Sequence, residues 1–252
     1  MAKNRQYYIR KAHRYLGVFL GIQFLLWTAG GLYFSWNDID EVHGDLHRKA
    51  PALLPADLKL APPDSVLNDL RELQGLSHVA SFQLIPLLGH PVYQVKLAAP
   101  AKAKGTIEEI TATKNYLLDA RTGRLRAPLA KNEAIDVARE AFLEPASIKE
   151  VKYITETDKH HEYRNNPLPA YAIFFEHPSH TTVYVSTELG TVQKFRNQKW
   201  RAFDFLWMLH TMDYEGRDDF GNILLRICAI LGLLTVLSGF LLFAFTQRIF
   251  KR

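Results

Sequence analysis

Four histidines of this chain lie next to its most apolar stretches, where an imidazole is an uncommon side chain. They are His13, His43, His47 and His210. An ionisable side chain at the edge of a membrane span is costly unless it has a partner, so these residues are the first candidates for a binding role. Neutral imidazole is a good axial ligand for haem iron, and two imidazoles give a low-spin centre suited to electron transfer.

His13 taken alone leaves two interpretations open. Its ring could bind haem iron at the membrane edge. It could equally reach the lipid head groups beside Arg14, because amphipathic side chains at the end of a span commonly extend to the interface. The residues themselves do not decide between these two roles.

The other three histidines are predicted to approach one membrane surface. His43 and His47 are four residues apart, so a continuing helix would place both on one face. His210 belongs to a segment in which Phe203 and Trp207 recur at helical spacing, as in a helix that lies along a membrane. A porphyrin held between His210 and either His47 or His43 would be covered by those two rings. The same three histidines are also a valid ligand set for zinc or copper.

A run of carboxylates follows His210 directly and consists of Asp213, Glu215, Asp218 and Asp219. Hard oxygen ligands suit ferric iron, as they suit other hard cations. We therefore expect Asp213 and Glu215 to be the catalytic pair that faces a ferric substrate. A solvated loop that uses these acids to cap helices is the simpler alternative.

Two uncharged runs are long enough to cross a membrane. Residues 15–36 would cover about 33 Å as a helix, which exceeds a hydrocarbon core of about 30 Å. Residues 227–246 form a second run, rich in Leu, Ile and Phe. The first run is longer than the apolar region of a typical signal peptide and lacks a small-residue cleavage site. We predict transmembrane helices over residues 15–36 and 223–246.

Basic residues flank both spans on the side of the chain ends: Lys3, Arg5, Arg10, Lys11, Arg14, Arg248, Lys251 and Arg252. Because basic flanks stay inside, residues 1–14 and 247–252 are predicted to be cytoplasmic, with the central region in the periplasm of a bacterium. The formal net charge of +5 therefore indicates contact with membrane lipid. Its distribution lacks the single basic face of a nucleic-acid-binding protein, so no nucleic acid partner is expected.

The residues also limit where electrons or metals could be held. Cys228 is the single cysteine, so one chain can build no disulfide framework and no iron–sulfur or zinc–thiolate site. The predicted cytoplasmic ends are too short for a nicotinamide or flavin domain, and no dinucleotide loop or P-loop motif occurs. Any electrons would have to come from a membrane quinol or from another electron-donor protein.

The region between the spans is predicted to contain two similar modules. A helix-like segment at residues 64–73 matches residues 131–140, and the turn Asp119–Gly123 matches Ser186–Gly190 at the same offset of 67 residues. The final glycine of each turn suits the positive φ of a hairpin loop. Strand-like runs occur at residues 91–97, 116–118, 169–175 and 182–185.

This pattern predicts a linker that carries His43 and His47, two modules, and a membrane-proximal amphipathic segment. Their ranges are, in order, residues 37–62, 63–129, 130–197 and 198–222. Each module would consist of a helix, strands and a hairpin. The chain would thus combine helices and antiparallel strands between its two spans.

The modules resemble the PepSY domain, in which a short helix precedes a small antiparallel sheet with an Asp-x-x-Thr-Gly hairpin. Residues 13–17 (His-Arg-Tyr-Leu-Gly) are similar to the motif that opens PepSY-associated transmembrane helices. Residues 209–211 (Leu-His-Thr), with Gly216, are similar to the motif before their last span. The resemblance covers nearly the whole chain. It implies an α+β membrane protein with two transmembrane helices flanking a duplicated PepSY-like helix-plus-antiparallel-sheet domain.

Members of that family include iron and ferrisiderophore reductases of bacterial inner membranes. The resemblance thus implies haem b as the cofactor and ferric iron or a ferric siderophore as the substrate, reduced on the periplasmic side in support of iron uptake. It favours His210, His13, His47 and His43 as haem-iron ligands.

Larger relatives carry four spans, whereas this chain has two. Two helices give too little surface to enclose a macrocycle, so we expect a homodimer whose four spans form a bundle around the cofactor. The small residues expected at the contact or cofactor faces are Gly17, Gly21, Gly232 and Gly239.

Two other functions fit the same sequence. The paired modules could be a non-enzymatic, membrane-anchored unit that binds a partner protein or regulates a protease. The chain could also be a metal-binding accessory subunit of an iron transporter. The first alternative predicts a colourless protein, and the second predicts bound metal without porphyrin.

Overall fold

The computed structural model describes residues 5–74, 78–98 and 113–246. The chain divides into a helical unit, Met1–Val42 with Lys199–Arg252, and a sheet unit, His43–Gln198. The helical unit therefore joins the two ends of the sequence. Of the segments expected in the cytoplasm, residues 1–4 and all of 247–252 lie outside the described residues.

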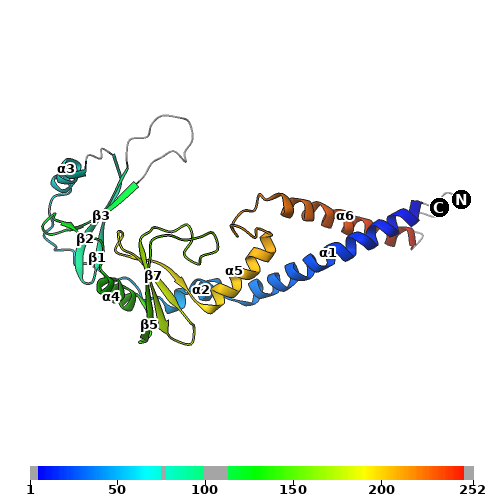
Figure 1. Cartoon of the computed structure of the whole chain (residues 1–252), viewed down its shortest axis with the longest axis horizontal. Coiled ribbons are helices and arrows are strands. Elements are labelled where there is room, and N and C mark those ends of the chain that lie inside the picture. The colour runs from blue at the N-terminus through cyan, green and yellow to red at the C-terminus, as the bar shows by residue number, and fades with distance from the viewer. Residues whose placement is uncertain (1–4, 75–77, 99–112, 247–252) are drawn as a thin grey trace. The chain divides into compact units, whose positions relative to one another are not determined.

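Two long helices of the helical unit contain the predicted spans. Helices α1 (Arg5–Trp36) and α6 (Ile223–Thr246) lie side by side (Figure 1). Each is long and apolar enough to cross a membrane, over Tyr7–Trp36 and Ile223–Phe245. Helix α1 begins before the predicted span because the residues ahead of Tyr15 include no proline or glycine that would interrupt it.

The surface of these two helices is strongly apolar. Large apolar side chains are exposed along both, among them Val18, Phe19, Ile22, Leu233 and Phe240. A soluble protein rarely exposes a contiguous apolar surface of this extent, because water contact with apolar area is unfavourable. The helices therefore require lipid or other protein around them.

Small residues allow α6 to pack closely on α1. A Cβ added at Gly232 would lie 3.1 Å from the Phe24 ring, and one at Gly239 would lie 3.3 Å from the His13 ring. By contrast, a Cβ at Gly17 or Gly21 would meet nothing within 4 Å. Of the four glycines expected at contact faces, two thus serve contacts inside the chain and two face open space.

Helix α5 (Gln198–Thr211) occupies the segment predicted to be amphipathic. Its start is tied to α1, since the Tyr33 hydroxyl donates a hydrogen bond to the Lys199 carbonyl oxygen (3.0 Å). Lys199 also forms an ion pair with Glu41 of the short helix α2 (Ile39–His43), at 2.6 Å. These contacts place α5 against the C-terminal part of α1.

The sheet unit contains two modules, each with one helix and a four-stranded antiparallel sheet in sequential order. The first comprises α3 (Pro63–Gln74), β1 (His78–Leu87), β2 (His90–Ala98), β3 (Thr113–Asp119) and β4 (Leu125–Arg126). The second comprises α4 (Lys131–Ala141), β5 (Ser147–Ile154), β6 (Ala170–Glu176), β7 (Thr182–Ser186) and β8 (Val192–Arg196). The expected duplication of a helix and an antiparallel sheet is therefore confirmed.

Local irregularities repeat between the modules as well. The first strand pair of each module changes register at its start, between Val79 and Ser81 and between Ile148 and Glu150. The hairpins predicted from the sequence end in Gly123 and in Gly190, with φ of 74° and 68°. Glycine adopts this left-handed conformation without the steric cost that a Cβ brings. Matching bulges and turns indicate that the modules share one plan.

The two modules share a hydrophobic core. Leu87, Val92 and Leu117 of the first module pack in one cluster with buried residues of the second, including Ile173 and Phe195. Helix α4 contributes its apolar face to the same cluster, whereas α3 packs in a separate cluster within the first module. The modules therefore form one compact unit rather than two independent domains.

The expectation that His43 and His47 share a helical face is wrong. Helix α2 ends at His43, Gly44 follows with φ of 80°, and Asp45–His47 form a separate 3-10 turn. A Cβ at Gly44 would lie 2.9 Å from the Phe195 Cβ, so the chain approaches β8 closely at this point. The turn at Gly44 breaks the helical register between the two histidines.

Replacing Gly44 tests this close approach. Gly44→Ala should lower the free energy of unfolding by about 2–4 kcal/mol, because it adds left-handed strain and a steric overlap. Gly89→Ala is the matched control, since Gly89 has a similar φ of 76° but nothing within 4 Å, and it should cost about 1–2 kcal/mol. Denaturant titration of the full chain in detergent, followed by circular dichroism, measures both. Equal losses would contradict the proposed overlap.

Candidate functional site

His210 lies in the last turn of α5, surrounded by aromatic rings. Its ring is parallel to Trp207 (interplanar angle 9°, centroids 6.2 Å apart). Trp27 and Phe34 of α1 complete the surroundings, with centroids at 6.1 and 6.0 Å. We call Trp27, Phe34 and Trp207 the aromatic cluster. The sequence analysis predicted Trp207 here but missed the two α1 residues, because nothing local in α1 indicates which of its faces meets α5.

The half-buried His210 imidazole has one nitrogen without a partner among the described residues. Its Nδ1 atom is buried and accepts or donates no hydrogen bond within the described residues. The ring lines an open cavity of about 390 Å³ together with Trp27, Trp207, Thr211, Phe220 and Leu225. An unpaired buried polar atom is costly, so this nitrogen marks His210 as a candidate for a role beyond packing. An apolar aromatic wall with one imidazole is a donor set that fits haem.

His13 is hydrogen-bonded at the other end of the helix pair. Its Nδ1 lies 2.7 Å from the Ser238 hydroxyl oxygen, and that hydroxyl lies 2.7 Å from the Thr235 carbonyl oxygen, which can only accept. This arrangement favours Ser238 as the acceptor from His13, with the proton on Nδ1 and the lone pair on Nε2. Such an outer hydrogen bond is what orients an imidazole for binding a metal. The sequence analysis did not identify Ser238.

His13 and His210 lie at two different depths of the helical unit. The Trp27 indole N–H donates to the His210 carbonyl oxygen at 2.9 Å. Trp27 and His13 are separated along α1 by a rise of about 21 Å at 1.5 Å per residue. A haem iron bound by both imidazoles would need them close together, so this pair would not serve one haem from one chain. Within the helical unit, each depth holds one imidazole.

His47 belongs to the sheet unit and has partners there. Its Nδ1 lies 3.0 Å from a Glu144 carboxylate oxygen, and its ring lies near Phe142 and His177. Burial raises the pKa of Glu144, but the hydrogen bond from His47 and the two imidazoles outweigh it, so the pKa is lowered. The exposed His43 ends α2. A haem bound between His210 and either His43 or His47 would join the two units, and this pairing stays a prediction.

The residues that the structure describes give little support for a metal ion bound directly by side chains. No three His, Cys, Asp or Glu side chains in the described ranges are placed so that they could hold a metal ion. The zinc or copper set of His43, His47 and His210 draws on both units. It therefore stays a prediction as well.

Asp213 organises the loop after α5. Its two carboxylate oxygens accept hydrogen bonds from four backbone N–H groups, those of Glu215, Gly216, Asp218 and Asp219, at 2.9–3.2 Å. The Gly216 N–H contributes most to lowering the pKa of Asp213, and together the four donors outweigh the effect of burial. With 9% of its surface exposed, Asp213 holds the loop with both oxygens. Its role as a substrate-facing carboxylate has no support from these contacts and stays a prediction.

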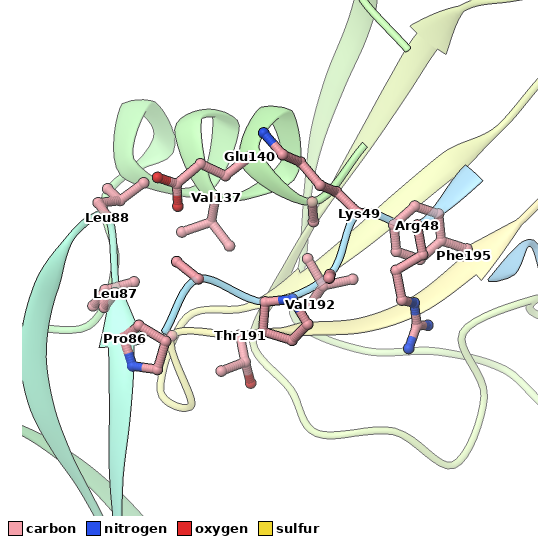
Figure 2. A pocket seen from close by; sticks show the side chains of 15 residues that line it. Arg48, Lys49, Pro86, Leu87, Leu88, Val137, Glu140, Thr191, Val192 and Phe195 are labelled. Carbon is pink, nitrogen blue, oxygen red and sulfur yellow. The ribbon is translucent and has the colours of Figure 1, made fainter. Parts of the chain in front are cut away.

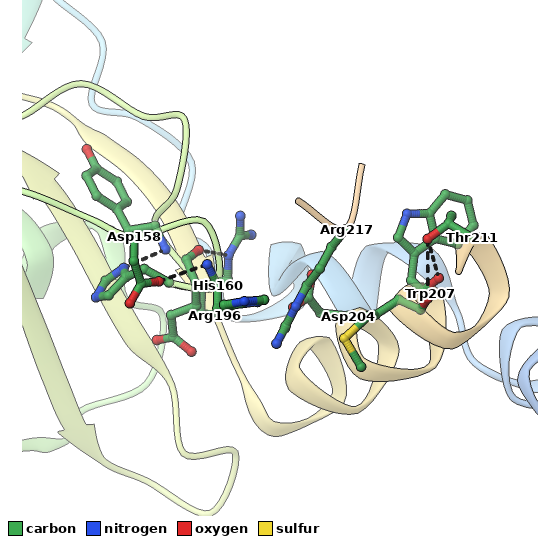
Figure 3. Close-up of polar contacts among 11 residues, drawn as sticks. Asp158, His160, Arg196, Asp204, Trp207, Thr211 and Arg217 are labelled. Atoms are coloured by element: carbon green, nitrogen blue, oxygen red, sulfur yellow. Dashed lines mark hydrogen bonds and ion pairs between the residues drawn. The ribbon is translucent and has the colours of Figure 1, made fainter. Parts of the chain in front are cut away.

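The loop is also anchored to α5 by an ion pair. The Arg217 guanidinium contacts the buried Asp204 carboxylate, and Figure 3 shows the arginine lying along the helix. Glu215 is exposed on this loop. Its role as a substrate-facing carboxylate stays a prediction.

A second cavity lies in the sheet unit. It has a volume of about 310 Å³ and is bounded by the linker after His47, the β1–β2 turn, α4 and the β7–β8 turn (Figure 2). Its walls are mostly apolar, including Leu87, Val137 and Phe195. Arg48, Lys49 and Glu140 supply charged groups. The cavity lies where the two modules and the linker meet.

The Asp213 loop predicts a pH dependence. Because folding lowers the Asp213 pKa, its contribution to stability is present above the unfolded pKa of about 3.9 and is lost as pH falls through the lower folded pKa. Asp213→Asn replaces an acceptor oxygen by a donor group and should cost about 1–3 kcal/mol at neutral pH. Unfolding midpoints between neutral and acidic pH should fall less steeply for this variant than for the wild type. The exposed Asp57→Asn serves as the control, and parallel profiles would contradict this role.

Comparison with known proteins agrees with the architecture. A family model for the PepSY-associated TM region matches residues 10–252. No curated protein and no solved structure matches the chain. The family match includes both apolar helices and both sheets, which confirms an α+β membrane protein. The chain belongs to the PepSY-associated TM region family.

Proposed function

We propose that this protein is a haem b-containing electron conduit of the bacterial inner membrane. It reduces ferric iron, or a ferric siderophore, on the periplasmic side and so supports iron uptake. Both chain ends then lie in the cytoplasm and the sheet unit in the periplasm, as the basic flanks favour. The main support is the half-buried His210 imidazole, which lines an aromatic cavity and whose buried Nδ1 has no partner among the described residues.

His210 and His13 have complementary parts in this proposal. The aromatic cluster packs around the His210 ring, while the Ser238 hydroxyl fixes the Nδ1 of His13 and leaves Nε2 for a ligand. Haem b bound at these imidazoles supplies a one-electron carrier at each depth. Glu215 on the exposed loop is the carboxylate that meets the ferric substrate. A membrane quinol or another donor protein delivers the electrons.

A homodimer completes the sites. The helical unit of one chain offers one imidazole at each depth, so a second copy would supply the second ligand at both. Gly17 and Gly21 form an open notch on α1, since no part of the described chain fills the space beside them. This notch favours a contact with a second copy. Close helix contacts in membranes commonly use such small residues.

The alternative of a non-enzymatic PepSY module has its own support in the sheet-unit cavity. An apolar cavity with a few charged groups is the usual form of a small-molecule site. A pyridine haemochrome assay with elemental analysis on the purified protein separates the functions. A reducible Soret band supports the conduit, a colourless protein supports the module, and metal without porphyrin supports the accessory subunit.

Substitution of the two histidines tests the conduit. His210→Ala and His13→Ala should each remove at least half of the bound haem and slow Fe(III) reduction at least about 10-fold, because each loses an axial ligand. Haem content and ferrozine-detected Fe(II) measure this. His90→Ala, at the exposed first residue of β2, is the control. Full pigment and full activity in both variants would refute the proposal.

The dimer is tested at the open notch. Gly21→Leu should leave the single chain folded, since nothing lies within 4 Å of the new Cβ, yet it should weaken dimerisation about 10-fold or more and lower haem retention. Phe19→Leu changes the opposite face of α1 and should do neither. Light scattering in detergent and Soret absorbance measure the two effects. Unchanged oligomer size with unchanged absorbance would contradict the dimer.

A further inference from the structure

The last carbonyl groups of α5 are bound by side chains from other segments. A helix C-terminus leaves carbonyl oxygens without partners inside the helix. Here the Leu209 carbonyl oxygen accepts a hydrogen bond from the Gln23 side-chain amide at 3.0 Å. The His210 carbonyl oxygen accepts one from the Trp27 indole N–H at 2.9 Å. The Thr211 carbonyl accepts from the Asn222 side-chain amide, also at 2.9 Å. Three consecutive carbonyls are thus satisfied by three side chains.

Gln23 is the most informative member of this set. It is 9% exposed in a helix that crosses the membrane. A polar amide in such a position is costly unless it forms hydrogen bonds. Its bond to Leu209 explains its presence, and that bond joins α1 to the residue directly before His210. Neighbouring Thr28 differs, because its hydroxyl donates to Phe24 of its own helix.

Trp27 holds His210 in two ways at once. Its indole N–H binds the backbone carbonyl, and its ring lies beside the imidazole. Met212, the residue that follows α5, has a left-handed φ of 54°. The chain therefore turns away directly after the capped carbonyls, which leaves the cap to define where α5 ends.

We propose that Gln23, Trp27 and Asn222 form an inter-helix cap whose function is to position His210. The cap fixes the depth of the His210 backbone against α1 and, through Trp27, the orientation of the imidazole. Gln23 and Asn222 are positioning residues, because they act through the backbone and touch no cofactor. The consequence for haem rests on the proposed function, whereas the cap itself does not.

The cap can be observed without any cofactor. Carbonyl-13C leucine combined with amide-15N histidine labels two peptide bonds of this chain, Leu46–His47 and Leu209–His210. Gln23→Leu removes the donor and keeps the side-chain volume, so the Leu209 carbonyl resonance of the full chain in micelles should move upfield. The Leu46 resonance is the internal control. Thr28→Val, on the same helix, should move neither.

The positioning role is read from the pigmented protein. Gln23→Leu should weaken haem affinity about 10-fold, the size typical for loss of an outer hydrogen bond at a metal site. It should also shift the low-spin electron paramagnetic resonance signal, because ring orientation changes. Gln23→Asn retains the amide donor and should restore part of the affinity, while Thr28→Val should match the wild type.

Each result decides one part of the inference. An unmoved Leu209 resonance in Gln23→Leu overturns the cap. A moved resonance with unchanged haem affinity and unchanged spectrum overturns the positioning role. A colourless wild-type protein overturns the proposed function instead, and the Leu209 resonance then still supports or overturns the cap.

Discussion

A polar group inside an apolar layer must find its partner within the protein, and this constraint shapes the helical unit. Gln23 and Trp27 satisfy carbonyls of α5, and Ser238 links His13 to the carbonyl of Thr235. The bonds of Gln23, Trp27 and His13 each join two segments, whereas the bond from Ser238 to Thr235 closes within α6. The polar residues of the spans therefore determine which faces meet, while the apolar residues supply the surface that faces outward.

The sheet unit is stabilised differently, by a core that both modules share. Its first module places Leu87 and Leu117 in the same cluster as the second module's Phe195. Gly190 sits so close to Leu117 that an added Cβ would lie 3.0 Å away. Removal of either module would expose apolar area that the other now covers. Each module is thus needed to cover the apolar core residues of the other.

The sequence was sufficient for features that depend on local chemistry or on repetition. The spans followed from uncharged length, and the hairpins at Gly123 and Gly190 followed from turn residues. Contacts between distant segments were not predictable, since no local pattern indicates that Gln23 binds Leu209. Nor does one indicate that the Asp213 carboxylate accepts hydrogen bonds from its own loop. The prediction that His43 and His47 share a helical face failed because Gly44 takes a left-handed φ that spacing alone does not reveal.

The two imidazole depths limit the symmetry that any pair of these chains can adopt. In the proposed dimer, a two-fold axis along the membrane normal puts equal depths of the two copies side by side, so His13 lies level with His13 and His210 level with His210. Both copies then cross the bilayer in the same direction. An antiparallel pair would set His13 against His210 and mix two unlike surroundings at each level. For the proposed dimer, the parallel arrangement is therefore the one that keeps like surroundings at each depth.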